Sequence, residues 1–482
     1  MNKVINFRWP LASAFIVSLL FTLPFIVNNN YFIDDWLRSD TGNSGWEGNG
    51  RPFASLLMSA LSLFPHGRHF FGDNALFDVF PLTLIASSAI LVFSGFIFCI
   101  AMNVESKGRA FIICILPVCN PFWVGNIEFR HDSLLMAASF LLAIFGAYIS
   151  FRSIKTCLLG AALLSISLGL YQTSINAYIS MCACVLLSAY LSDEKGLMKK
   201  SLLSLISLAA GYIIYSKVIM HSSGLSNYAT ANSKMLGLDH GLFEGLINNF
   251  RSFASFFFET SPPLYFAMLT ILILITLVSI VMRHGLSLKS LLSLLVICIC
   301  LVMTLGVLAM FERPAIAART MMPLCLLTML CVSLCQDRLS VASSSVSAGL
   351  VIIAFSFSYI ISSAINSVER NDRFIAMHIA SIYAKESAGS RSNLYITGKP
   401  RFTRYSDRVI KRLPMAKYMI ISAFNNYRFK YSLMAQYGID SKAPDLDKAR
   451  RYDHISRHGT PNYSDSLVDS FQDGDTLIYR IK

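Results

Sequence analysis

The chain has 482 residues, of which 54% are hydrophobic and 14% are charged, and its mean hydropathy is +0.55. Soluble domains carry about a quarter charged residues, so this composition excludes a water-soluble globular fold for residues 1–365. The net charge of +13 could suit a nucleic-acid partner, but the basic residues are scattered in short clusters that form no continuous basic face, so we expect none.

Long apolar runs separated by short charged clusters predict an α-helical, multi-pass membrane protein with about eleven spans. The first run follows Lys3 and Arg8 and lacks a small-residue cleavage site, which indicates a retained span rather than a cleaved signal sequence. The third, fifth and tenth runs are short or contain Pro117 or Pro323, so one or two of them could be re-entrant. The spans are expected near residues 11–28, 75–102, 110–125, 133–151, 156–171, 173–191, 201–220, 263–282, 289–311, 321–335 and 341–365.

The basic residues predict the topology, because cytoplasmic loops of membrane proteins are enriched in Lys and Arg. Clusters that include Lys3/Arg8, Lys107/Arg109 and Arg152/Lys155 fall on one side of the predicted spans, which we assign to the cytoplasm. The N-terminus is then cytoplasmic and the C-terminus periplasmic, in the inner membrane. The outer segments are residues 29–74, 126–132, 221–261, 312–320 and 366–482.

The first outer segment carries the pattern that most resembles a reaction centre. Asp34 and Asp35 lie a few residues beyond the first span, and carboxylates at that depth are costly unless paired. Arg38 and Arg51 are the expected partners, with Glu47 between them. Because neighbouring side chains of an extended segment point to opposite faces, we expect one of the two aspartates to enter a cavity. The alternative is a surface turn in which both acids are solvated.

Two further clusters of charge fall in predicted outer turns. Glu128, Arg130 and Asp132 crowd a short turn between two spans, and Arg313 and Arg319 lie in a later one. The simpler interpretation of the first cluster is a charged turn in which Asp132 caps the next helix.

Residues 366–482 predict a small α/β domain after the last span. We expect strands at 393–397, 418–422 and 476–481 and helices at 368–385 and 426–437. The stretch 398–408 is basic and aromatic. It predicts either a solvated loop or a contact with lipid phosphates or an anionic acceptor glycan.

Three short motifs resemble those of one enzyme family. They are Asp34-Asp35-Trp36-Leu37-Arg38, Gly50-Arg51-Pro52 and Phe129-Arg130-His131-Asp132-Ser133. With the order of spans and loops over residues 1–365, they resemble bacterial O-antigen glucosyltransferases of the Gtr type, which temperate phages encode to convert the serotype of their host and which belong to the GT-C class. The resemblance implies undecaprenyl-phosphate-glucose as the donor, a lipopolysaccharide O-antigen sugar as the acceptor, a donor synthase and a flippase as partners, and an acid of the first outer loop at the reaction centre. Asp34 and Asp35 are the matching positions.

The chemistry of such a transfer can be met by these residue types. A base must take the proton of the attacking acceptor hydroxyl, and Asp34 or Asp35 is the expected base, with Asp132 or Glu47 orienting a sugar hydroxyl. Cations must stabilise the leaving phosphate. The substrate-binding residues are expected among Arg38, Glu47, Arg51, Glu128, Arg130, Arg313 and Arg319. One-step displacement would invert the anomeric centre.

Other functions remain compatible with this sequence. Paired carboxylates could hold a divalent metal, although the arginines could do the same electrostatic work, so we expect no cofactor. An O-antigen polymerase or ligase would share the outer arginines but use a diphosphate-linked donor. A flippase or transporter is less favoured, because the sequence has no internal repeat and few charges inside its spans.

Overall fold

The computed structural model describes residues 7–64, 76–237, 241–387 and 392–482. The chain forms two compact units. Unit 1 contains residues 1–27 and 44–359, and unit 2 contains residues 28–43 and 360–482. The short segment 28–43, part of the first predicted outer loop, is therefore grouped with the C-terminal residues rather than with the helices that flank it in sequence.

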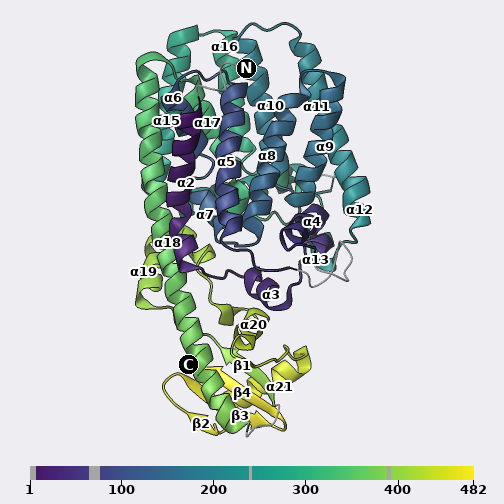
Figure 1. Cartoon of the computed structure of the whole chain (residues 1–482), viewed down its shortest axis with the longest axis vertical. Helices are drawn as coiled ribbons and strands as arrows, with labels where there is room; N and C mark the ends of the chain where they lie inside the picture. Colours follow the sequence, from purple (N-terminus) through teal and green to yellow (C-terminus); the bar gives the residue numbers. More distant parts are fainter. Residues whose placement is uncertain (1–6, 65–75, 238–240, 388–391) are drawn as a thin grey trace. The chain divides into compact units, whose positions relative to one another are not determined.

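Unit 1 is a helix bundle, in which α5, α8, α9, α10 and α11 pack side by side (Figure 1). Its first half contains α2 (Arg8–Asn28), α4 (Pro52–Leu61), α5 (Leu82–Ala101), α6 (Lys107–Ile115), α7 (Pro121–Ile127), α8 (Asp132–Ser150), α9 (Ile154–Leu170) and α10 (Ser174–Leu191). Its second half contains α11 (Leu197–Ile214), α12 (Met220–Ser222), α13 (Asn227–Asn232), α14 (Gly241–Thr260), α15 (Pro263–His284), α16 (Leu288–Val302), α17 (Leu324–Leu334) and the first part of α18 (Asp337–Glu386).

The structure confirms a polytopic helical chain. Seven described helices are long and apolar enough to cross a membrane, and four shorter apolar helices accompany them. Each predicted span overlaps a helix, but the third is split into α6 and α7 around Pro117, and the ninth is helical only to Val302 and continues as the 3-10 helix Gly306–Met310. Asn120 begins α7 by accepting a hydrogen bond from the Trp123 N–H at 2.9 Å. The total of about eleven spans and the cytoplasmic side of the bundle stay predictions.

Small residues set the spacing of the helices in the bundle. A Cβ on Gly95 of α5 would lie 2.6 Å from the Cα of Cys114 in α6, and one on Gly160 of α9 would lie 2.8 Å from the Gly146 carbonyl oxygen in α8. Because backbone cannot yield as a flexible side chain can, these helices pack at a distance that only glycine permits.

The predicted outer segments that belong to unit 1 contact one another. The Ser226 N–H donates to the Gly48 carbonyl at 2.8 Å, and Lys234 pairs with Glu312 at 2.7 Å. The Asn126 side chain donates to the Arg319 carbonyl at 3.3 Å. Segments that lie far apart in sequence therefore meet at one end of the bundle.

Unit 2 is built around a four-stranded sheet with the order β1-β4-β3-β2. The strands are β1 (Asn393–Gly398), β2 (Tyr463–Ser464), β3 (Val468–Asp473) and β4 (Thr476–Ile481). β1 and β4 are parallel, and the other pairs are antiparallel. The helices are α3 (Asp34–Thr41), α19 (Arg404–Arg412), α20 (Phe429–Ala435), α21 (Leu446–His458) and the end of α18.

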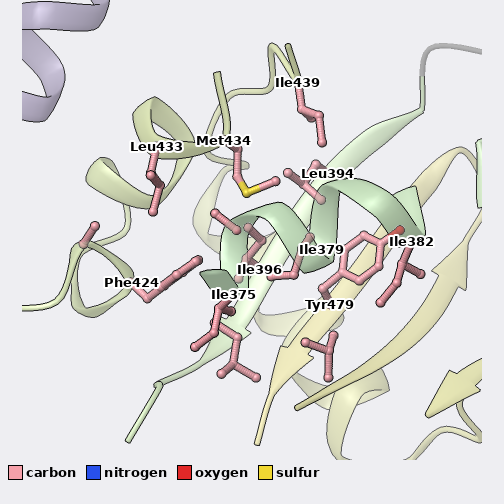
Figure 2. Close-up of a cluster of buried hydrophobic side chains, with 14 of the residues drawn as sticks. Ile375, Ile379, Ile382, Leu394, Ile396, Phe424, Leu433, Met434, Ile439 and Tyr479 are labelled. Atoms are coloured by element: carbon pink, nitrogen blue, oxygen red, sulfur yellow. The ribbon is translucent and has the colours of Figure 1, made fainter. Parts of the chain in front are cut away.

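The core of unit 2 joins three parts of the chain. Ile375 and Ile379 of α18 pack with strand residues such as Leu394 and Tyr479 and with Met434 of α20 (Figure 2). Trp36 of α3 belongs to the same buried cluster. The segment 28–43 is thus held to the C-terminal residues by the burial of apolar surface, which is the main driving force for such packing.

The structure corrects several expectations about the C-terminal residues. Strands at 393–397 and 476–481 are confirmed, but a strand at 418–422 is wrong. That segment links two 3-10 turns, Pro414–Tyr418 and Ala423–Asn425, and its residues Met419 and Ile420 are buried rather than paired in a sheet. The helix expected at 368–385 is the end of α18, which runs through residue 365 without a break, and the helix at 426–437 shortens to α20.

Candidate functional site

A buried carboxylate lies at the centre of the candidate site in unit 1. Asp132, in the first turn of α8, accepts a hydrogen bond from the Trp46 indole N–H at 2.9 Å. The same Oδ1 atom is 3.1 Å from Nη1 of Arg51. All three side chains are buried. A carboxylate with a cation and an N–H donor on one oxygen is held in a fixed orientation.

Arg51 is fixed from several directions. It precedes α4, and its Nε donates to the carbonyl of Leu170, at the end of α9, at 2.6 Å. Its guanidinium also lies 5.2 Å from the centre of the Tyr171 ring. Nη2 is buried and has no hydrogen-bond partner among the residues that the structure describes. Buried guanidinium donors are rarely left unsatisfied, so Nη2 points to an acceptor supplied by a ligand.

Arg319 supplies a second cation to this region. It lies in a short 3-10 helix, Ala318–Met321, and its guanidinium is 5.1 Å from the centre of the Phe129 ring. The Tyr171 hydroxyl is within electrostatic range of Arg51, Arg319 and Asp132 together. Within the described parts of the chain, no carboxylate lies within 4 Å of the Arg319 guanidinium. Arg51 and Arg319 are therefore the two cationic groups of this region that could contact an anion.

Other predicted residues of the same turn are buried but differently engaged. Arg130 pairs with Asp78 at 2.9 Å and lies 4.3 Å from the centre of the Phe80 ring. Its backbone carbonyl accepts a hydrogen bond from the Thr83 hydroxyl at 2.6 Å. Glu128 is also buried. The ion pair with Asp78 gives Arg130 a structural role at the start of α5, in addition to any contact with substrate.

Two further predicted residues lie toward the surface of unit 1. Glu47, in the 3-10 helix Glu47–Asn49, accepts a hydrogen bond from the Ser44 hydroxyl at 2.8 Å. Arg313 is exposed, beside Glu312. The structure therefore brings Arg51, Asp132 and Arg319 together more closely than it does Glu47 or Arg313.

The two aspartates of the first predicted outer loop, Asp34 and Asp35, belong to unit 2 and are described within it. The segment that carries them is the helix α3, not an extended strand. Asp34 pairs with Arg38 at 3.6 Å and keeps 55% of its side chain exposed. Asp35 is fully buried and accepts the Phe32 N–H at 3.3 Å. The two carboxylates thus have different environments, although the reason is helical rather than extended geometry.

Sequence reasoning missed Trp46 and Tyr171 as parts of the site. Trp46 lies in a glycine-rich polar stretch and is nevertheless fully buried, in a cluster with Ala54, Met58 and Leu135. The one signal available was a tryptophan beside the Gly50-Arg51-Pro52 motif, which suggests an interface anchor rather than a donor to a carboxylate. Across the described residues, no three His, Cys, Asp or Glu side chains come together as a metal site.

Comparison of the chain with known proteins identifies its family. A curated protein of Salmonella phage P22, described as an uncharacterized 55.3 kDa protein in the gtrB 5' region, is 26% identical over 246 residues. The match covers 50% of this chain and 48% of that protein, so it spans about half of each. No solved structure matches the chain significantly. The family model described as glucosyl transferase GtrII matches residues 23–330, which include both arginines and the carboxylate of the site. The chain therefore belongs to the glucosyl transferase GtrII family.

Proposed function

We propose that this protein transfers a glucosyl residue from undecaprenyl-phosphate-glucose to a sugar of the lipopolysaccharide O-antigen, on the periplasmic face of the inner membrane. The observation that carries the proposal is the buried guanidinium of Arg51, which is held by Leu170 and Asp132 and keeps Nη2 for an outside acceptor. A phosphate oxygen is a fitting acceptor, because arginine binds phosphate with directed, charge-assisted hydrogen bonds. The phage relative, named for its place beside gtrB, supports a role in serotype conversion.

The arginines would act on the leaving group. As the bond from the anomeric carbon to the phosphate oxygen breaks, negative charge grows on the phosphate, and preorganised cations stabilise it without having to reorganise. Arg51 and Arg319 are the proposed donors to that phosphate. Asp132 is a positioning residue in this scheme, because it holds Arg51 in place.

The base would come from the first outer loop. It takes the proton of the acceptor hydroxyl as that oxygen attacks the anomeric carbon, and one such displacement inverts the configuration. We favour Asp34 over Asp35, because half of its side chain is exposed and an acceptor can reach it, whereas Asp35 is fully buried. Asp35 would then fix the start of α3 through the Phe32 N–H.

The test compares Asp34→Asn with Asp35→Asn in cells that supply undecaprenyl-phosphate-glucose. Glucose on lipopolysaccharide is measured by mass spectrometry and its linkage by NMR, with membrane abundance checked for each variant. We expect Asp34→Asn to lose transfer by about a hundredfold or more at normal abundance, as removal of a general base does. Loss in Asp35→Asn alone would make Asp35 the base. Full transfer in both variants would remove the loop from the chemistry.

The donor is tested separately, with purified protein in proteoliposomes. Transfer from the monophosphate-linked sugar is expected, and transfer only from a diphosphate-linked oligosaccharide would indicate a polymerase or ligase instead. Movement of the lipid across the bilayer without a glycosidic product would indicate a flippase. We also propose that no metal is needed, so activity should persist in excess chelator, and its loss with recovery on adding Mg²⁺ or Mn²⁺ would contradict that proposal.

A further inference from the structure

The C-terminal unit carries a strongly basic surface on and around α19. Residues 399–417 contain seven basic residues against one acid, a net charge of +6. All seven basic side chains are exposed. They are Lys399, Arg401, Arg404, Arg408, Lys411, Arg412 and Lys417.

Helix α19 arranges these charges as a stripe. Ser406 and Val409 are its buried residues, while Arg404, Arg408 and Arg412 recur every four residues on the exposed side. The one acid, Asp407, pairs with Lys411 at 2.6 Å. Among the residues that the structure describes, the three arginines have no acidic partner within 4 Å. Their charge is therefore available to an outside anion.

The stripe is anchored beside the end of the last predicted span. The Ser406 hydroxyl donates to the Ala364 carbonyl of α18 at 3.0 Å, and the Thr403 and Ser367 hydroxyls are 2.7 Å apart. Figure 1 shows α19 lying along α18. Ala364 is the next-to-last residue of the apolar run 341–365, so α19 lies where that run gives way to polar sequence. Phosphate groups of a bilayer lie at this level, just outside the hydrocarbon.

We propose that the basic stripe of α19 binds the phosphate groups of anionic phospholipids in the surrounding bilayer. Each exposed base near a negatively charged leaflet is attracted to it, and arginine suits phosphate particularly well. Phe402 and Tyr418, exposed beside the stripe, are side chains that favour the interface. The bases are spread along the whole helix, which suits several headgroups better than one bound ligand. The inference goes beyond the proposed function, because it involves neither donor nor acceptor and holds for either leaflet.

The experiment uses the full-length protein, purified and reconstituted in nanodiscs of phosphatidylcholine with one-fifth spin-labelled lipid. The label is carried by phosphatidylglycerol, by phosphatidylcholine or by a polyprenyl phosphate, and the motionally restricted fraction reports lipid held at the protein. Wild type is compared with the triple variant Arg404→Gln, Arg408→Gln, Arg412→Gln. The control is Lys448→Gln, Arg450→Gln, Arg457→Gln, which removes the same charge from exposed positions of α21. Near-wild-type thermal melting establishes that each variant is folded.

We expect wild type to prefer phosphatidylglycerol, and the α19 variant to lose about tenfold or more of that preference, since each base contributes roughly a fivefold factor. The α21 control should keep the wild-type preference, and high salt should weaken it. Equal preferences in wild type and the α19 variant would overturn the proposal, as would equal losses in both variants. A wild-type preference for polyprenyl phosphate that excludes phosphatidylglycerol would also overturn it and make the stripe a donor contact.

Discussion

At the scale of single residues, the ion pair between Arg51 and Asp132 decides how the site is held. Both groups are buried, and the same carboxylate oxygen also accepts the Trp46 indole. Such a pair adds little net stability by itself, but removing one partner leaves the other charge buried without a compensating charge. The pair is therefore a means of fixing a guanidinium in place.

Asp132→Ala is expected to destabilise the protein by about 3–5 kcal/mol, because it leaves a buried guanidinium without its carboxylate. Asp132→Asn should cost less, since the amide oxygen still accepts from Trp46. The double variant Arg51→Ala, Asp132→Ala should lose less stability than the sum of the two single changes. Thermal melting in detergent compares the four variants, Arg51→Ala, Asp132→Ala, Asp132→Asn and the double variant, with wild type. Additive losses would show that the two side chains do not stabilise each other.

Lys430 gives the C-terminal unit a dependence on pH. Its ammonium is buried and donates to the Ile396 carbonyl. Burial lowers the pKa of Lys430 from 10.5 to about 8, although the Asp453 charge acts in the opposite direction. Between these two values the unfolded chain binds the proton and the folded chain releases it, so stability rises with pH across that window.

We expect the folded state to gain on the order of 3 kcal/mol from this residue as pH rises from 8 toward 10.5. In Lys430→Met that gain is absent. The melting temperature of wild type minus that of Lys430→Met should therefore increase between pH 7.5 and pH 10. Lys448→Met, at an exposed position, is the control for the loss of a lysine side chain. A flat difference for Lys430→Met would contradict the argument.

At the scale of elements, glycine positions set the distances between helices. Gly95 of α5 faces the backbone of α6, whereas Gly108 in the first turn of α6 has open space around it. Helices pressed together in this way cannot accept a methyl group without moving apart.

Gly95→Ala is expected to destabilise the bundle by roughly 1–3 kcal/mol, as overpacking does. Gly108→Ala should be neutral or stabilising by about 0.5–1 kcal/mol, because alanine favours the helix and meets no neighbour. Yield and thermal melting of the two variants make a matched comparison. A Gly95→Ala protein as stable as Gly108→Ala would mean that α5 and α6 can separate freely.

The sequence predicted the elements of the bundle well and the C-terminal residues less well. Runs of apolar residues identify membrane-length helices almost directly, because in lipid the backbone must bond within its own segment. Residues 418–422 look like a strand for a different reason. Met419 and Ile420 are apolar because they fill a core, and no local signal separates that from sheet pairing. The sequence also contains no helix-terminating residue, such as Pro or Gly, between Ala364 and Arg370, so it does not show where the last span ends and whether the helix continues.

The sequence suggested candidate residues for the site but not their contacts. Charged residues at predicted outer turns made Arg51 and Asp132 candidates, but which arginine contacts which acid depends on how α4, α8 and α9 pack. The contact of Trp46 with Asp132 could not be predicted, because it too depends on how the helices pack. Asp34 and Asp35 differ in exposure because α3 is helical, and a segment of eight residues gives a weak helical signal.

At the scale of the whole molecule, the segment 28–43 belongs to the C-terminal unit. The Tyr31 N–H donates to the Glu369 carboxylate at 2.9 Å, and Arg373 lies 5.3 Å from the centre of the Trp36 ring. Trp36 is buried among residues of α18, β1 and α20. A substitution in residues 28–43 should therefore lower the stability of the C-terminal part of unit 2.

Trp36→Ala is expected to destabilise unit 2 by about 3–5 kcal/mol through loss of a buried aromatic side chain. Trp9→Ala is the control, because Trp9 is 80% exposed. Limited proteolysis of membranes, followed with a C-terminal tag, should show faster loss of the tag in Trp36→Ala than in wild type or Trp9→Ala. Equal rates in the three proteins would mean that residues 28–43 do not support the C-terminal fold.

The packing of residues 28–43 against the C-terminal residues means that this segment is synthesised well before its partners. Tyr31 and Glu369 are 338 residues apart, and ribosomes add about 5–20 residues per second, so residues 28–43 emerge roughly twenty seconds to a minute before their first partner exists. The strands of that core come later still, since β4 ends at Ile481. A nascent chain can thus insert its helices while the aspartates of α3 have no core to hold them. A premature stop codon in β4 would leave the core that holds α3 incomplete, so that the inserted bundle would carry an unanchored acidic loop.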